Sequence, residues 1–482
     1  MPETSPRRPL VLAAVMSAMF MIAIEATIVS TAMPQIAAKL GDLHLYSWVF
    51  SSFLLAQTAT TIVFGKLSDM YGRKPVLIVG VAIFLVGSAL CGFAGSMPEL
   101  IIYRLIQGFG AGAIQPMALT IIGDLYPGTE RGRVQGYLSS VWGVSSVLGP
   151  LAGGLLTEYL SWAWVFWINI PVGLLTVYLF SRYLKEQVKR TERRVDWLGA
   201  LLFTASTAGL MLALTEVGGV GSVAIGAAVV FVVCGALFVW QERRAADPMV
   251  AFELWLRRPI ATANGAMLLS GMALIGLTAF LPMYVQGVMG RSALVAGFTL
   301  TAMSLGWPVG AMLAARIFFE RLGLRGTLML GGMLLPVGAA AMLFLDSGTS
   351  PFIAGAGSLV MGLGMGLLST ASIVLIQGSV GWAERGAATA SNVFARMLGS
   401  TFGATVMGGV LNASLSHHSV AVSYDQVRRL LDTSGPSIAD PAVQAALGQG
   451  LHLTFWAMFL ITLSGFAAAS LVPRTALRQP AE

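Results

Sequence analysis

Two charged side chains, Glu25 and Arg104, interrupt long apolar stretches of the chain. Glu25 lies within Met-Ile-Ala-Ile-Glu-Ala-Thr-Ile-Val-Ser, and a carboxylate inside hydrocarbon is costly unless it is paired or protonated. Burial favours the neutral form of a carboxyl group and a nearby cation favours its ionised form. Glu25 is therefore predicted to take up and release protons. The alternative is a carboxylate that a helix-packing partner holds permanently.

Arg104 is predicted to be the partner of Glu25, because it is the cation that lies well inside an apolar stretch of the first half. The alternative is that Arg104 extends toward the outer interface, near Glu99. Asn392 and Arg396 lie four residues apart and share one helix face. Such polar groups either face a wet cavity or form hydrogen bonds between helices.

Two glycine-containing runs indicate special backbone positions. Residues 65–74 read Gly-Lys-Leu-Ser-Asp-Met-Tyr-Gly-Arg-Lys and combine a small residue at a helix end, an acid that can cap, and cations suited to lipid headgroups. The second run has glycine and proline inside an apolar segment, which loosens a membrane helix and allows close contact with a neighbour. Its members are Gly143, Gly149, Pro150, Gly153 and Gly154.

The elements that must position these residues are membrane-spanning helices. The 482 residues are 56% hydrophobic and 11% charged, with a mean hydropathy of +0.78, whereas soluble domains carry about 25% charge. Reading for apolar stretches of about 20 residues predicts about 14 spans. They cover 10–33, 47–66, 75–95, 98–123, 134–157, 163–181, 196–217, 221–241, 260–286, 294–316, 326–346, 351–376, 387–411 and 452–473.

The charge distribution gives the orientation. With a cytoplasmic N-terminus, the inner loops hold most of the lysines and arginines, and the outer loops hold only Lys39, Arg291, Arg428 and Arg429. This asymmetry predicts that both termini are cytoplasmic and that the number of spans is even. The net charge of +7 thus indicates membrane orientation and not affinity for nucleic acid.

The chain repeats itself. Residues 104–112, Arg-Leu-Ile-Gln-Gly-Phe-Gly-Ala-Gly, align with residues 358–366, Ser-Leu-Val-Met-Gly-Leu-Gly-Met-Gly. The same offset of 254 residues places Glu130-Arg131-Gly132 on Glu384-Arg385-Gly386 and Gly149 on Gly403. Two related halves are typical of secondary transporters, whose binding site lies near the midplane.

The domain prediction follows from this repeat. A first six-helix bundle covers 1–181, and basic linkers with an inserted helix pair (196–217 and 221–241) cover 182–258. A second six-helix bundle covers 259–482 and includes an external loop at 412–450.

Two other patterns lack the context that their usual function requires. Gly108-Phe109-Gly110-Ala111-Gly112 lacks the strand–turn–helix context of a dinucleotide site, and His417 and His418 have no convergent metal ligands. No Ser/His/Asp or Cys/His cluster is found, and there are four histidines. We therefore expect no enzyme, metal or cofactor; a membrane enzyme or a non-transporting sensor is the remote alternative.

The motifs resemble those of a known family. Residues 65–74 are similar to the loop signature of the major facilitator superfamily, Arg104 with Gln107-Gly108 resembles its fourth-span motif, and residues 143–154 resemble its antiporter motif. Glu25-Ala-Thr-Ile-Val with Met33-Pro34, residues 162–173 (Trp-Ala-Trp-Val-Phe-Trp-Ile-Asn-Ile-Pro-Val-Gly) and Asp196-Trp-Leu-Gly199 resemble the fourteen-span drug:proton antiporter family. Glu25 and Ser30 depart from the aspartate and asparagine usual there, and Ser358 replaces the fourth-span arginine in the second half.

The resemblance implies a major facilitator fold of two pseudo-symmetric six-helix bundles plus two inserted helices. It implies a proton-coupled antiporter that exports small amphipathic or cationic compounds, with Glu25 and Arg104 in proton coupling. A cytoplasmic charge cluster, which latches one conformation, would contain Gly65, Asp69, Gly72, Arg73, Lys74 and Asp124. The substrate cavity is expected to include Gln57, Gln115, Trp142, Tyr284, Asn392 and Arg396.

The remaining expectations concern the partners, the location and the oligomeric state of the chain. The partners would be a small-molecule substrate, protons and membrane lipid, and one chain in the cell (inner) membrane could work as a monomer. The alternatives are an exporter of one specific metabolite, lipid or siderophore, and a proton-coupled importer.

Overall fold

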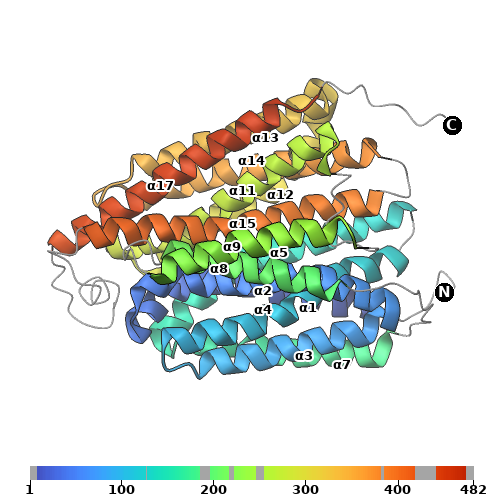
Figure 1. Ribbon diagram of the computed structural model, residues 1–482, viewed down its shortest axis with the longest axis horizontal. Coiled ribbons are helices and arrows are strands. Elements are labelled where there is room, and N and C mark those ends of the chain that lie inside the picture. Colours follow the sequence, from blue (N-terminus) through green and yellow to red (C-terminus); the bar gives the residue numbers. More distant parts are fainter. Residues whose placement is uncertain are drawn as a thin grey trace. The chain divides into compact units, whose positions relative to one another are not determined.

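The computed structural model is helical throughout the residues that it describes, 8–125, 128–184, 196–215, 222–245, 255–380, 385–417 and 441–473 (Figure 1). A few side chains inside these ranges, among them those of Asp69 and Asp124, fall outside the description. Long apolar segments become helices because a helix satisfies its own backbone hydrogen bonds where no water is available.

The chain divides into two compact units. Unit one comprises residues 1–249 with 292–297 and 424–438, and unit two comprises 250–291, 298–423 and 439–482. The inserted helix pair thus belongs to unit one, where α8 packs against both α2 and α9.

Unit one begins with a long helix that carries Glu25 and ends with the inserted pair. Its elements are α1 (Arg8–Leu40), η1 (Leu43–Leu45), α2 (Tyr46–Tyr71), α3 (Arg73–Gly92), α4 (Met97–Leu125), α5 (Gly128–Tyr159), α6 (Trp164–Trp167), α7 (Asn169–Tyr183), α8 (Trp197–Thr215) and α9 (Ser222–Glu242). Helix α1 packs against α4, α5 and α7, and α3 lies beside α7 (Figure 1).

Unit two repeats the pattern with two short π-helical turns. Its elements are α11 (Arg258–Met283), η2 (Tyr284–Val288), α12 (Ala293–Leu313), η3 (Ala314–Phe318), α13 (Phe319–Leu343), α14 (Pro351–Gly378), α15 (Arg385–His417) and α17 (Pro441–Ser470). The first turns of α12, through Gly297, group with unit one.

Across the described residues, each predicted span coincides with helix, but some boundaries differ. Helix α15 continues to His417 and α17 begins at Pro441, so both ends of the predicted external loop 412–450 are helical. The chain also kinks at Gly323 inside α13, where φ is 68°. Within the described residues, ten helical stretches are long and apolar enough to cross a membrane, one of them the continuous Ala293–Leu343. The number fourteen stays a prediction.

The glycine repeat has a packing explanation. A methyl group added at Gly108 or Gly112 would meet α2, and one added at Gly110 would meet α3. The equivalent glycines of α14 behave alike, because Gly362 and Gly366 face α12 and Gly364 faces α13. The glycines of α4 and α14 therefore bring two neighbours on different sides into close contact. This explains the spacing that superficially resembles a dinucleotide motif.

Candidate functional site

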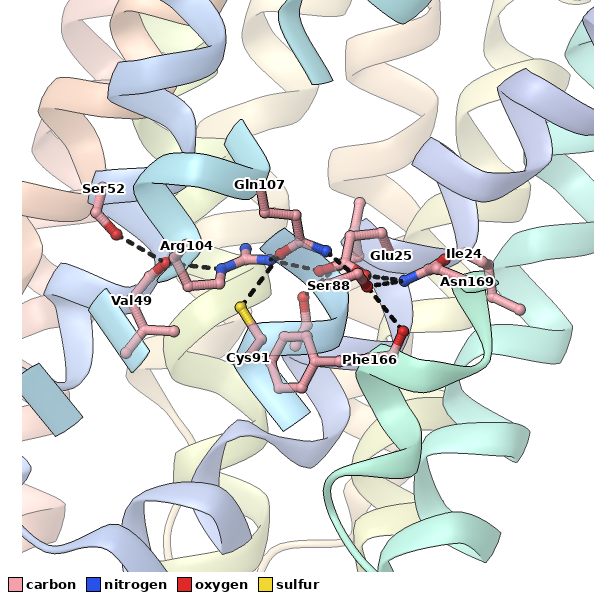
Figure 2. A network of polar contacts seen from close by, with 12 residues as sticks. Ile24, Glu25, Val49, Ser52, Ser88, Cys91, Arg104, Gln107, Phe166 and Asn169 are labelled. Carbon is pink, nitrogen blue, oxygen red and sulfur yellow. Dashed lines mark hydrogen bonds and ion pairs between the residues drawn. The ribbon is translucent and has the colours of Figure 1, made fainter. Parts of the chain in front are cut away.

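Glu25 lies inside unit one with 1% of its surface exposed. Its Oε1 pairs with Nη1 of Arg104, and Nδ2 of Asn169 donates a hydrogen bond to its Oε2 at 2.6 Å (Figure 2). Both carboxylate oxygens are thus bound by donors from other helices. The predicted partner of Glu25 is confirmed, and the alternative in which Arg104 extends toward Glu99 is wrong.

Arg104 is held on several sides. Its Nε donates to the Val49 carbonyl of α2 at 3.2 Å, and its Nη1 donates to Oε1 of Gln107 at 2.7 Å. Its guanidinium carbon lies 4.1 Å from the centre of the Phe53 ring. Only 3% of the residue is exposed. Arginine suits this place, because its planar fork of donors can bind a carboxylate, an amide and a carbonyl together.

A second ring of polar side chains supports the ion pair. Gln107 Nε2 donates to Ser88 Oγ at 3.2 Å, and Ser88 Oγ donates to the Phe166 carbonyl at 2.8 Å (Figure 2). Asn169 Nδ2 also lies 3.3 Å from Ser88 Oγ, and the Cys91 thiol is 3.7 Å from Oε1 of Gln107. The network therefore joins α1, α2, α3, α4, α6 and α7.

Small residues and a helix break bring these side chains together. A methyl group at Gly87 would overlap the backbone of Gln107, and one at Gly108 would overlap Phe53, so glycine sets the close approach of α3 and α2 to α4. The α-helical pattern breaks at Ile168, directly before Asn169. Asn169 thereby opens α7 at the depth of Glu25.

In this arrangement, protonation of Glu25 would remove its ion pair with Arg104. Breaking a buried ion pair by neutralising one partner leaves the other charge uncompensated, which is strongly unfavourable. Protonation of Glu25 would therefore force Arg104 to find new partners. Because six helices contribute groups to the network, such a change acts on their packing as well as on one side chain.

The antiporter-like motif packs on the same helix as Glu25. A methyl group at Gly149 would overlap the side chain of Thr27, and one at Gly153 would meet Ile28. Thr27 Oγ1 also donates to the Ser145 carbonyl at 3.1 Å. By contrast, nothing lies within 4 Å of a methyl group at Gly143. Helix α5 thus contacts α1 at Thr27 and Ile28, which follow Glu25 along α1.

The structure describes the loop motif in part. Gly72 has a φ of 94°, which favours glycine, where α2 ends and α3 begins. Lys74 donates to the carbonyls of Ser181 and Leu184 at 2.8 and 2.9 Å, at the end of α7. These bonds make Lys74 a cap for α7. The expected cluster of Asp69, Arg73 and Asp124 stays a prediction, because both acidic side chains lie outside the described residues.

The six residues expected in the substrate cavity separate into different environments. Tyr284 is 1% exposed and donates to the Leu345 carbonyl at 2.7 Å, and Asn392 donates to Asn264 and Ser372 at 3.0 and 2.9 Å. These two placements fit helix packing better than cargo contact. Gln57 is also buried, Gln115 and Arg396 are partly exposed, and Trp142 is exposed.

Sequence reasoning did not assign a site role to Ser88 or Asn169, and it mentioned Gln107 only as part of a motif. Neutral polar residues occur often in membrane helices, and their sequence does not reveal which of them face an acid. The signal that could have found Asn169 is its position next to the break before α7.

A sequence model of the Major Facilitator Superfamily matches residues 15–404. Multidrug resistance protein 3 of Bacillus subtilis (strain 168) is 39% identical over 399 residues, which cover 81% of this chain and 77% of that protein. Multidrug transporter protein MdtP of the same organism is 32% identical over 418 residues, with coverages of 84% and 76%.

Solved structures of low sequence identity share the fold. A bacterial homolog of the human lysosomal transporter Spinster, in an inward-facing and unoccupied conformation, has a TM-score of 0.68 at 17% identity and covers 97% of both chains. An auto-inhibited peptide transporter of the POT family has a TM-score of 0.67 at 15% identity, with 99% of both chains covered. These likenesses concern architecture alone.

Proposed function

The chain belongs to the major facilitator superfamily, and we propose that it is a proton-coupled antiporter that exports small amphipathic compounds from the cell. The single observation that carries this proposal is the buried network in which Arg104 and Asn169 bind Glu25. Relatives named for multidrug resistance and transport support the direction of transport. The family consists of transporters and not of enzymes.

The mechanism that we propose is alternating access. Two related halves expose a binding site first to the cytoplasm and then to the outside. Substrate enters from the cytoplasm or the inner leaflet while Glu25 is ionised and paired with Arg104. A proton from outside then neutralises Glu25 and weakens its hold on Arg104, which favours the return. Both termini lie in the cytoplasm, and a single chain suffices.

Asn169 can serve both protonation states of Glu25. Its Nδ2 donates to the carboxylate, while its Oδ1 is buried and has no hydrogen-bond partner among the described residues. A rotation of the amide would present this oxygen to the hydroxyl of a protonated Glu25. The side chain can thus compensate both forms, because an amide carries a donor group and an acceptor.

The available energy is sufficient for uphill export. A tenfold proton gradient supplies about 1.4 kcal/mol per proton. The membrane potential adds about 2.3 kcal/mol per net charge per 100 mV. One proton under both forces can therefore support a concentration ratio of about a hundredfold or more.

The test is Glu25→Gln in proteoliposomes with an imposed pH gradient. Glutamine keeps the shape and loses the ionisable group, so we expect gradient-driven transport of amphipathic dyes to vanish while insertion into the membrane persists. Glu25→Asp should keep partial activity, because the carboxyl group survives with a shorter reach. Full gradient-driven activity in Glu25→Gln would refute the assignment.

A matched control is Glu99→Gln, which removes the same charge from an exposed residue in the first turn of α4. This variant should transport like the wild type. Reversing the sign of the pH gradient separates an exporter from an importer, and a dye panel with cationic, neutral and acidic members measures the range of substrates.

A further inference from the structure

Unit two carries a cation far from either end of a helix that the sequence predicts to cross the membrane. Arg396 lies on α15, which has 33 residues from Arg385 to His417 and is about 50 Å long at 1.5 Å per residue. Arg396 is about 7.5 Å along the axis from the helix midpoint, so a span centred on a hydrocarbon layer about 30 Å thick would hold it inside that layer. Cations at this depth are rare and mark functional sites.

No protein anion compensates Arg396 in the described part of the chain. Among the described side chains, none accepts a hydrogen bond from its guanidinium or forms an ion pair with it. The described acidic residues of unit two are Glu320, in the first turn of α13, and Asp346, in the turn that follows α13. Both are exposed. Arg104 of unit one, in contrast, is paired with Glu25.

The contact that Arg396 does make is aromatic. Its guanidinium carbon lies 5.8 Å from the ring centre of Trp307 on α12, and both residues are partly exposed. An unpaired guanidinium beside an indole ring offers one group for an anion and one surface for an apolar ring. An amphipathic organic acid carries both matching parts, an anionic group and an apolar body.

The neighbouring polar residues do not compete for this role. Asn264, Ser372, Ser391 and Asn392 bind one another across α11, α14 and α15 at distances of 2.9 to 3.0 Å. Their donors are used in helix packing. Arg396 lies one turn further along α15 and remains available.

The internal repeat shows that this charge is specific to the second half. The offset that relates α4 to α14 places Trp142 opposite Arg396 in the alignment. The glycine contacts relate Gln57 to Trp307, because methyl groups at Gly112 and Gly366 would meet their respective carbonyls. The equivalent pair in unit one is therefore neutral. At this position of the repeat, the cation is present in the second half only.

We propose that Arg396 and Trp307 form a recognition site for the acidic group and the aromatic body of an amphipathic organic acid. This inference rests on the proposed export function and narrows its substrate class, because cationic compounds would be repelled at this position. Arginine stays charged at every physiological pH, so the site acts as a permanent anion receptor.

The test is equilibrium binding of three related probes, 1-pyrenebutyrate, the neutral 1-pyrenebutanol and a pyrenyl trimethylammonium cation. The protein is held in phosphatidylcholine nanodiscs, which lack anionic lipid, and energy transfer from tryptophan reports binding above empty nanodiscs. We expect the wild type to bind the acid at least about tenfold more tightly than the alcohol, as charge-assisted hydrogen bonds allow. Arg396→Gln should abolish this preference and leave affinity for the alcohol unchanged.

The controls separate charge from folding. Arg321→Gln removes one positive charge from an exposed position at the start of α13 and should retain the preference of the wild type. Arg396→Lys keeps the charge and should retain part of it, and Trp307→Leu should weaken binding of all three probes. Thermal unfolding checks that each variant is folded.

Two outcomes would overturn the proposal: a wild type without preference for the acid, or Arg396→Gln with the preference intact. If Arg396→Gln does not fold, the affinities of the wild type and of Arg396→Lys for the three probes are compared instead, and the proposal requires that both prefer the acid. Phosphatidylglycerol nanodiscs show whether lipid headgroups occupy the same receptor. No proton gradient is present in the binding measurement, so a failure of the proposed proton coupling leaves this test unaffected.

Discussion

Glu25 and Arg104 are each tolerated inside the bundle because of the other. A charge withdrawn from water must be compensated by an opposite charge and by hydrogen bonds to its remaining donors or lone pairs. Here Val49 and Gln107 satisfy Arg104, and Asn169 satisfies the second oxygen of Glu25. The supporting residues are neutral, so the pair can change its protonation without a third charge in the network.

Asn169→Ala should weaken both the fold and proton coupling. The substitution removes a hydrogen bond to a charged group, which is worth about 1.5–3 kcal/mol, and it takes away the amide that can compensate both forms of Glu25. We expect a lower melting temperature in detergent and a reduced transport rate under a pH gradient.

Asn264→Ala provides the matched comparison. Asn264 is also fully buried, but the side chains to which it is hydrogen-bonded, Ser391 and Asn392, are neutral. We expect a similar loss of stability with gradient-driven transport per folded molecule preserved. Equal loss of coupling in both variants would contradict a special role for Asn169.

The sequence predicted the charged members of the site and not their neutral neighbours. An acid or an arginine in an apolar stretch is conspicuous because of its cost, so Glu25 and Arg104 could be found and paired. Ser88 costs little anywhere in a helix, and only the packing of α3 against α4 and α6 reveals that it bridges Gln107 and the Phe166 carbonyl. The hydrogen bond from Tyr284 to the Leu345 carbonyl could not be read from the sequence, and the role of Tyr284 in a substrate cavity stays a prediction.

At the scale of helices, glycine position decides which neighbours come close. Gly149 and Gly153 lie four residues apart on α5 and both face α1, next to Thr27 and Ile28. Side chains there would separate the two helices. Through Gly149 and Gly153, the antiporter-like motif therefore forms the surface of α5 that packs against α1, the helix that carries Glu25.

Gly149→Ala should disturb this surface and Gly143→Ala should not. The added methyl group at position 149 overlaps Thr27, and overpacking of this kind costs about 1–3 kcal/mol. At position 143 the space is open, and alanine is the better helix former. We expect lower thermal stability and slower transport for Gly149→Ala alone. Identical behaviour of the two variants would show that the α1–α5 contact is unimportant.

Helix positions were largely predictable, since an apolar run of about 20 residues leaves few alternatives to a span. Helix ends were less so. The polar residues after position 411 indicated a loop, yet α15 continues to His417, and α17 begins at Pro441, where proline suits a first helical turn. The π-helical turn at Tyr284–Val288 has no periodic signature and could not have been predicted.

For the whole molecule, the distribution of lysine and arginine defines an orientation that can be measured. Ser347→Cys lies in the exposed turn after α13, and Ser181→Cys lies near the end of α7, at the opposite side in the predicted topology. In a background with Cys91→Ala and Cys234→Ala, a membrane-impermeant maleimide applied to intact cells should label position 347 only. Labelling should include position 181 once the membrane is permeabilised. The reverse pattern would place both termini outside.

The sealing of Glu25 also bears on the state of the protein when no cargo is present. A carboxyl group with 1% exposure, enclosed by side chains from several helices, offers almost no surface that water can reach. A resting carrier in this arrangement would be proton-tight. The cell could then keep many copies in its membrane without short-circuiting the gradient on which its respiration and ATP synthesis depend.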